Sequence, residues 1–175
     1  MPPGVSDNPT PRPAGAGDMF LSVKGAQHGQ ISGEALDSQH KGEIEVLGWS
    51  WGMQGTPSLG GSSPSGKSTI RELRIVKRVD KASTALMSAL RTNETIKQAV
   101  LTLRKAGKTP LEYLKITIEQ GRIVSLEIEA GDTSGSSTLV EKVSFSFNKI
   151  EVEYTPQGAD GQPQGGTTFQ DQWGA

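Results

Sequence analysis

Residues 42–52 read GEIEVLGWSWG, and this stretch alternates as a β-strand does. Because successive side chains of a strand point to opposite faces, Ile44 and Val46 share one face. In Trp49-Ser50-Trp51 the apolar side chains have the opposite parity. The change of parity across Leu47-Gly48 therefore predicts a bulge or bend within one strand.

The two tryptophans of this stretch, Trp49 and Trp51, are separated by a single serine. The period of a strand sends both indoles to one face, and we expect them to fill the core. Ser50 then lies on the opposite, wet face of the strand. A small hydroxyl at that position suits a surface that passes or holds another protein.

The same alternation recurs on both sides of this stretch, in residues 73–79, 98–104, 114–130 and 143–154. The apolar parity of 114–130 is unbroken. It favours one long strand bent near Gly121, with a tight hairpin at Gln120-Gly121 as the alternative. In 143–154 the parity changes, which predicts a second bulge near Asn148-Lys149.

Residues 82–90 have a different period. Apolar side chains recur there at i, i+3, i+4, i+7 and i+8, which indicates an amphipathic helix of about three turns. Asp80 or Ser83 is the candidate cap at its start, and Asn93 the residue that ends it. About six long antiparallel strands with one short helix predict a mainly β protein, closed into a barrel or folded as a sandwich.

The two ends of the chain differ from its middle. Residues 1–18 are rich in proline and glycine and predict a loosely extended N-terminal extension without the apolar core of a signal peptide. Residues 19–157 hold nearly all the patterned hydrophobicity and predict one domain. Residues 158–175 are rich in glycine and glutamine, and they form either a last edge strand or a loose tail.

Composition excludes several classes of protein. The 175 residues carry a formal net charge of -1, which argues against binding nucleic acid or anionic lipid through bulk charge. There is no cysteine and there are two histidines, so we expect no thiolate chemistry, no histidine-rich metal centre and no cofactor. No apolar run is long enough to predict a membrane-spanning helix.

One motif resembles an enzyme site. Residues 61–68 match the phosphate-binding loop pattern GxxxxGK[ST], in which backbone N–H groups cradle phosphates and Lys67 would reach them. Such a loop needs a buried strand before it and a helix after it. Here a polar Gly/Ser/Pro stretch precedes it and an alternating, strand-like segment follows, so a nucleotide site is the disfavoured interpretation.

The segment 52–68 is long for a loop without secondary structure. Two interpretations stay open: a mobile surface loop, or an arm that becomes ordered against a neighbouring subunit.

Other candidate residues are weaker. We interpret His40-Lys41 as a solvated turn. The alternating acids of 127–129 and 151–153 fit the polar face of a half-buried strand better than a catalytic pair. The basic residues Arg71, Arg74, Lys77, Arg78 and Lys81 form a cluster without interleaved aromatics, so nucleic-acid binding is not expected.

Six segments, taken together and in order, resemble the haemolysin-coregulated protein (Hcp) family, the tube protein of bacterial type VI secretion. They are MFLSV (19–23), HKGEIEVLGWSWG (40–52), VDKAS (79–83), LRKAG (103–107), LEYLKI (111–116) and EVEYTPQ (151–157). The resemblance covers most of the chain. The first eighteen residues lie outside it, and the end, FQDQWGA (169–175), is similar to the family's last strand but short.

The resemblance implies a β-barrel with a flanking helix, whose copies form a homohexameric ring. Rings stack into a tube, which a contractile sheath propels with a VgrG-type spike, and effector proteins ride inside. The family's long loop contacts neighbouring protomers or rings; in this sequence it includes Gly52, Met53, Gln54, Leu59, Gly60, Gly61, Ser62 and Lys67. The family's lumen-facing serine, which contacts cargo, maps to Ser50.

The expected function is therefore that of a structural, non-enzymatic tube subunit. It is assembled in the bacterial cytoplasm and exported without a signal peptide. The alternative is a monomeric secreted β-barrel effector or binding module.

Overall fold

The computed structural model describes residues 17–57, 67–107, 110–132 and 137–174, with the backbone alone at 67, 131, 132, 137 and 138. The elements in chain order are β1 (Asp18–Gly25), β2 (Gly29–Ile31), β3 (Ile44–Ser50), β4 (Met53–Thr56), β5 (Lys67–Ile70), β6 (Leu73–Arg78), α1 (Ser83–Arg91), β7 (Ile96–Lys105), β8 (Leu111–Asp132), β9 (Ser137–Ser146), β10 (Lys149–Tyr154) and β11 (Thr167–Gln172).

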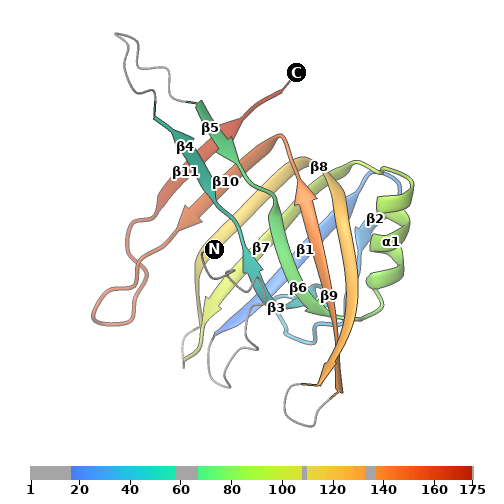
Figure 1. The fold of residues 1–175 in the computed structure, drawn as a ribbon. Coiled ribbons are helices and arrows are strands. Elements are labelled where there is room, and N and C mark those ends of the chain that lie inside the picture. The colour runs from blue at the N-terminus through green and yellow to red at the C-terminus, as the bar shows by residue number, and fades with distance from the viewer. Residues whose placement is uncertain (1–16, 58–66, 108–109, 133–136, 175) are drawn as a thin grey trace.

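Six strands close into an antiparallel barrel (Figure 1). Their order is β8-β7-β1-β3-β6-β9, and pairing of β9 with β8 closes the ring of strands. Two strands continue the sheet beyond the point of closure, because β10 pairs with the first half of β8 and β11 pairs with β10. We call these two strands the β10–β11 extension. The prediction of a mainly β barrel with one short helix is confirmed.

The barrel interior is the hydrophobic core. Apolar side chains from its six strands are buried there, and Leu86 and Ala89 add the inner face of α1. Helix α1 covers the predicted periodic segment. The expected cap by Asp80 or Ser83 is wrong: the N-cap residue is Ala82, and no side chain caps the helix, although Asp80 accepts a hydrogen bond from the backbone N–H of Ala82. Asn93 has the left-handed φ of 52° that follows many helix ends.

The bulge predicted in the first quoted strand is confirmed. The pairing of β3 with β6 shifts register between Val46 and Gly48. The shift places Trp49 inward after Val46, as the change of parity requires. Both Trp49 and Trp51 are partly buried and pack against the core, and Ser50 is exposed.

The long strand bent near Gly121 is also confirmed, because β8 is continuous through that residue. Its details differ from the expected pattern. At the bend at Gln120-Gly121 the core-facing side chains of β8 change from even to odd residue numbers, so Ile123 faces the core. A register shift between Ile123 and Ser125 changes them back to even numbers. The two shifts cancel, so the sequence parity looks unbroken, but Val124 faces outward and is 46% exposed.

The expected bulge near Asn148-Lys149 is wrong. The chain there leaves one strand and starts another, with β9 ending at Ser146 and β10 beginning at Lys149. Both strands pair with β8, and the break lies opposite its bend at Gly121. Because the break between β9 and β10 lies opposite the bend in β8, the sheet can change direction at this point.

The outward face of β7 is exposed at Gln98 but is not solvated in its second half. Thr102 and Arg104 on that face are buried, because the chain between β2 and β3 folds over them. This cover also buries His40, so the interpretation of His40-Lys41 as a solvated turn is wrong for the histidine.

The chain after β10 ends in a strand. β11 pairs with β10 along its whole length, from Lys149 opposite Gln172 to Tyr154 opposite Thr167. Of the alternatives left open by the sequence, the described part of the C-terminal segment takes the edge strand.

Candidate assembly surface

The outward face of one sheet carries a row of polar residues. This front sheet consists of β3, β6, β9 and residues 122–132 of β8. Ser50 lies opposite Arg74, Arg74 opposite Ser144, and Ser144 opposite Ser125. The row crosses all four strands, so Ser50 belongs to a broad polar face and not to an isolated site.

Beside Ser50 a groove of about 540 Å³ opens at the edge of this face. It is lined by Ser50, Trp51, Gly52, Ile70, Arg71, Glu72 and Arg74. The indole Nε1 of Trp51 is buried and has no hydrogen-bond partner among the described residues. The lining offers the hydroxyl of Ser50, the guanidinium groups of Arg71 and Arg74 and the carboxylate of Glu72, which suit polar contacts with another molecule.

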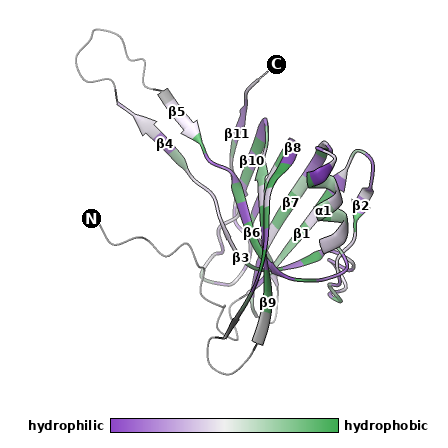
Figure 2. Ribbon diagram, turned by 45° about the vertical axis from the view of Figure 1, so that its right-hand side comes forward, coloured by the Kyte–Doolittle hydropathy of each residue, from purple (hydrophilic) through white to green (hydrophobic). Residues whose placement is uncertain are grey.

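The chain between β3 and β6 leaves the barrel as a hairpin, which projects away from its body (Figure 2). β4 and β5 pair from Met53 opposite Ile70 to Thr56 opposite Lys67. All four residues of β4 are exposed, and Met53 is 54% exposed. The expected structureless segment is therefore a two-stranded arm where it is described. At its base, Arg71 donates a hydrogen bond to the side chain of Gln54 at 3.1 Å.

The arm also bears on the nucleotide-like motif. Lys67 and Ser68, its last two residues, lie on β5, so a strand stands where a phosphate-binding loop needs a helix. The first six residues of the motif, 61–66, lie outside the described residues. So do the predicted contact residues Leu59, Gly60, Gly61 and Ser62.

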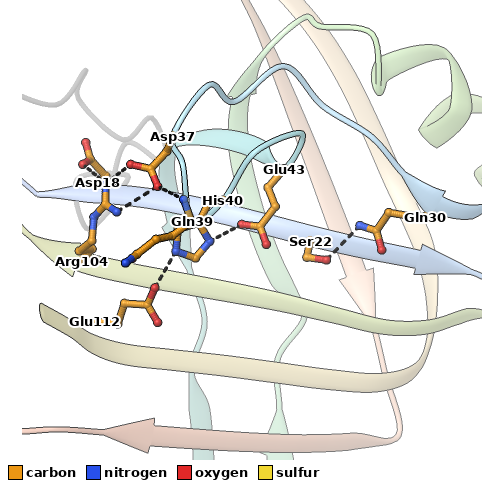
Figure 3. A network of polar contacts seen from close by, with 9 residues as sticks. All are labelled: Asp18, Ser22, Gln30, Asp37, Gln39, His40, Glu43, Arg104 and Glu112. Atoms are coloured by element: carbon orange, nitrogen blue, oxygen red, sulfur yellow. Dashed lines mark hydrogen bonds and ion pairs between the residues drawn. The ribbon is translucent and has the colours of Figure 1, made fainter. Parts of the chain in front are cut away.

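A polar network lies on the outer side of β1 and β7, at the start of β1 (Figure 3). Arg104 contacts Asp37 through both terminal nitrogens, at 3.1 and 2.6 Å, and Asp18 at 2.9 Å. His40 stacks on Phe20 with ring centroids 4.4 Å apart. The network ties the β2–β3 connection onto the barrel.

The two ring nitrogens of His40 contact carboxylates from two elements. Nδ1 lies 2.6 Å from Glu43, just before β3, and Nε2 lies 2.6 Å from Glu112 on β8. Sequence reasoning missed this role because Glu112 is 72 residues away.

The network predicts a pH dependence. Hydrogen bonding to Arg104 is the main cause that lowers the pKa of Asp37 from 3.8 to about 2. A depressed folded-state pKa stabilises the fold above the unfolded pKa of 3.8, and this contribution disappears as pH falls toward 2. Between pH 4 and 2 the free energy of unfolding of Asp37→Asn is therefore expected to fall less steeply than that of the wild type.

Urea unfolding at several pH values measures this difference. Asp160→Asn, at an exposed carboxyl in the connection between β10 and β11, serves as the control and keeps the wild-type slope. Equal slopes for the wild type and Asp37→Asn would show that the ion pair does not couple to folding.

The basic cluster predicted around β6 is divided by the fold. Lys77 is fully buried, and its Nζ lies 2.8 Å from Glu141 on β9, 2.9 Å from Asp80 and 3.1 Å from the hydroxyl of Ser83. Arg71, Arg74, Arg78 and Lys81 are exposed. The cluster is therefore a buried ion pair surrounded by separate surface cations.

The comparisons with known proteins agree with this architecture. The model of the family described as "Type VI secretion system effector, Hcp" matches residues 20–154. The chain belongs to the Hcp family. The resemblance noted in the sequence is confirmed, and the chain is a type VI secretion tube protein of a structural family, not of a known enzyme family.

The relatives cover nearly the whole chain. The Hcp1 protein of Pseudomonas aeruginosa is 38% identical over 152 residues, which are 85% of this chain and 90% of that one. Hcp1 from Salmonella typhimurium has a TM-score of 0.68 at 31% identity, covering 90% of this chain and 94% of that one. A structure described as a type six secretion system protein has a TM-score of 0.76 at 25% identity, covering 87% and 92%.

The Hcp match ends at residue 154, before β11, so the extension's outer strand lies beyond the family model. Members of the family are secreted by the type VI machinery. Among the helices in the described part of this chain, none is long and apolar enough to cross a membrane.

Proposed function

We propose that this protein forms homohexameric rings that stack into the inner tube of a type VI secretion machine. The observation that carries the proposal is the pair of open edges on the front sheet. A sheet edge with unpaired backbone groups is ready to pair with another strand.

One open edge belongs to β3. Its first two residues, Ile44 and Glu45, pair with β1. From Val46 onward, β6 is the one strand that pairs with β3 among the described residues, so the other edge of β3 is open there. The other edge belongs to β8. Residues of β8 up to Gly121 pair with β7. From Arg122 onward, β9 is the one strand that pairs with β8 among the described residues, so the other edge of β8 is open there.

The two edges fit each other across copies. The four strands of the front sheet alternate in direction, so its two edge strands run antiparallel. The β3 edge of one copy therefore has the direction needed to pair with the β8 edge of the next. A head-to-tail contact of this kind repeats around a ring if its rotation closes.

The rest of the proposal follows from the family. The polar outward face of the front sheet lines the lumen and contacts effector proteins. The β4–β5 arm joins one ring to the next. A contractile sheath propels the tube with a VgrG-type spike after assembly in the bacterial cytoplasm, and export needs no signal peptide.

Mass in solution tests ring formation. Light scattering on the purified protein should give six times the mass of one chain. A single-chain mass at every concentration would instead favour the alternative, a monomeric secreted effector or binding module. Magnesium-dependent ATP binding that is lost in Lys67→Ala would favour a nucleotide-binding enzyme.

The lumen position of Ser50 makes a separate prediction. Ser50→Gln places a longer side chain in the polar row, so we expect reduced loading of a lumen-carried effector while rings still form. Co-purification of effector with rings, and its export, measure the effect. Ser38→Gln, on the exposed β2–β3 connection, is the matched control. Normal export of the effector by Ser50→Gln would refute the role.

A further inference from the structure

The β10–β11 extension continues the core-facing side of the sheet beyond the closed barrel, where fewer side chains cover it. Ile116, Val152 and Phe169 lie opposite one another across β8, β10 and β11. Ile116 is buried, Val152 is partly buried, and Phe169 is 40% exposed. Tyr154, on the same face one pair further along, is 45% exposed. Two aromatic side chains on the inner side of a sheet are thus uncovered in the single chain.

The position of this face indicates what covers it. The extension lies on the side of the barrel that also carries the β4–β5 arm, and α1 lies on the opposite side (Figure 1). α1 also packs against β8, whose second half is one open edge of the front sheet. If the β8 edge of one copy joins the β3 edge of its neighbour, α1 of the first copy is brought toward the extension of the second.

The two segments carry net charges of opposite sign. Residues 149–174 contain one lysine and four carboxylates, a net charge of -3. Asp171 lies on the face of Phe169, whereas Glu151 and Glu153 lie on the other face of the extension, opposite Gln170 and Thr168. Residues 78–97 contain four cations and two carboxylates, a net charge of +2. The four cations, Arg78, Lys81, Arg91 and Lys97, are exposed. Of the two carboxylates, Glu94 is buried against His28 and Asp80 is paired with Lys77.

The outward face of α1 matches the extension in spacing as well. Met87 is half-buried and Arg91 exposed, one helical turn apart, which is about 6 Å along the axis. Phe169 and Asp171 are two residues apart on one face of β11, about 6.8 Å. A methionine thioether packs well against aromatic rings, and the carboxylate of Asp171 then lies beside the guanidinium of Arg91.

We propose that in the ring the β10–β11 extension of one protomer covers helix α1 of the next, with Phe169 on Met87 and Asp171 beside Arg91. This inference rests on the proposed ring. It assigns the extension to the contact within a ring and leaves the arm for the contact between rings.

Cross-linking tests the contact, and the absence of native cysteine makes the test clean. The double variant Met87→Cys with Phe169→Cys should, on oxidation, give a ladder of covalent oligomers up to the closed ring. Met87→Cys with Thr168→Cys is the matched control, because Thr168 points to the other face of β11. The control should give no ladder.

Exchanging the two charges tests the same contact without introducing cysteine. Asp171→Arg and Arg91→Glu should each raise the protein concentration for half-maximal ring formation by about tenfold, and together they should restore it. Wild-type rings without a ladder and without charge rescue would overturn this inference and leave the ring intact. A wild-type chain that forms no ring would overturn both proposals.

Discussion

Lys77→Met is expected to lower the free energy of unfolding by about 3–5 kcal/mol, because it leaves a buried carboxylate without its cation. Lys77 and Glu141 both have fully buried side chains, 2.8 Å apart. One oxygen of Glu141 accepts hydrogen bonds from Lys77 and from Ser83, the latter at 2.5 Å, and the other has no partner among the described residues. Without the lysine, Ser83 is the one remaining hydrogen-bond donor to this carboxylate among the described residues.

Urea unfolding of two further variants separates the buried charge from a simple loss of lysine. Lys142→Met removes a half-exposed lysine that lies 3.4 Å from Glu129, and should cost less than about 1 kcal/mol. Adding Glu141→Leu to Lys77→Met should recover much of the lost stability. If Lys77→Met costs no more than Lys142→Met, Lys77 does not compensate a buried charge.

Deleting residues 55–65 is expected to abolish ring stacking and leave the barrel folded. The described strands of the arm pair with each other, and Gly55 and Thr56, which the deletion removes from β4, are exposed. Ile70, at the end of β5, packs against the core and is retained. Removing exposed residues outside the core changes the thermal unfolding midpoint little. The arm projects from the barrel, so its loss removes surface that is available to another ring.

Electron microscopy of tubes and thermal unfolding measure the two effects separately. A variant that replaces the same residues with a Gly/Ser chain of equal length controls for the spacing of β4 and β5, and it should also fail to stack. Intact stacks combined with a large drop in the unfolding midpoint would show that the arm supports folding and not assembly.

Local pattern was enough to predict the elements whose side chains alternate without interruption. The bulge near Gly48 and the inward tryptophans follow from parity in one short stretch, as does the exposed Ser50. The outward position of Val124 could not be predicted, because two opposite shifts cancel in the sequence.

Burial of polar residues depended on contacts between distant parts of the chain. His40 is polar and stands beside Lys41 before a strand, so residue type alone predicts solvent. Its burial depends on Glu112, 72 residues later. Lys77 shares the inward parity of Leu73 and Ile75 on β6, but the buried carboxylate that pairs with it, Glu141, is 64 residues away. No local pattern contains either partner.

The proposed tube rests on copies of this chain fitting one another around an axis. Negative-stain electron microscopy of the purified protein tests this most directly, because rings are visible without any knowledge of ligands. We expect annular particles with sixfold symmetry in top view and stacks in side view. Particles the size of one chain, with no rings at any protein concentration, would contradict it.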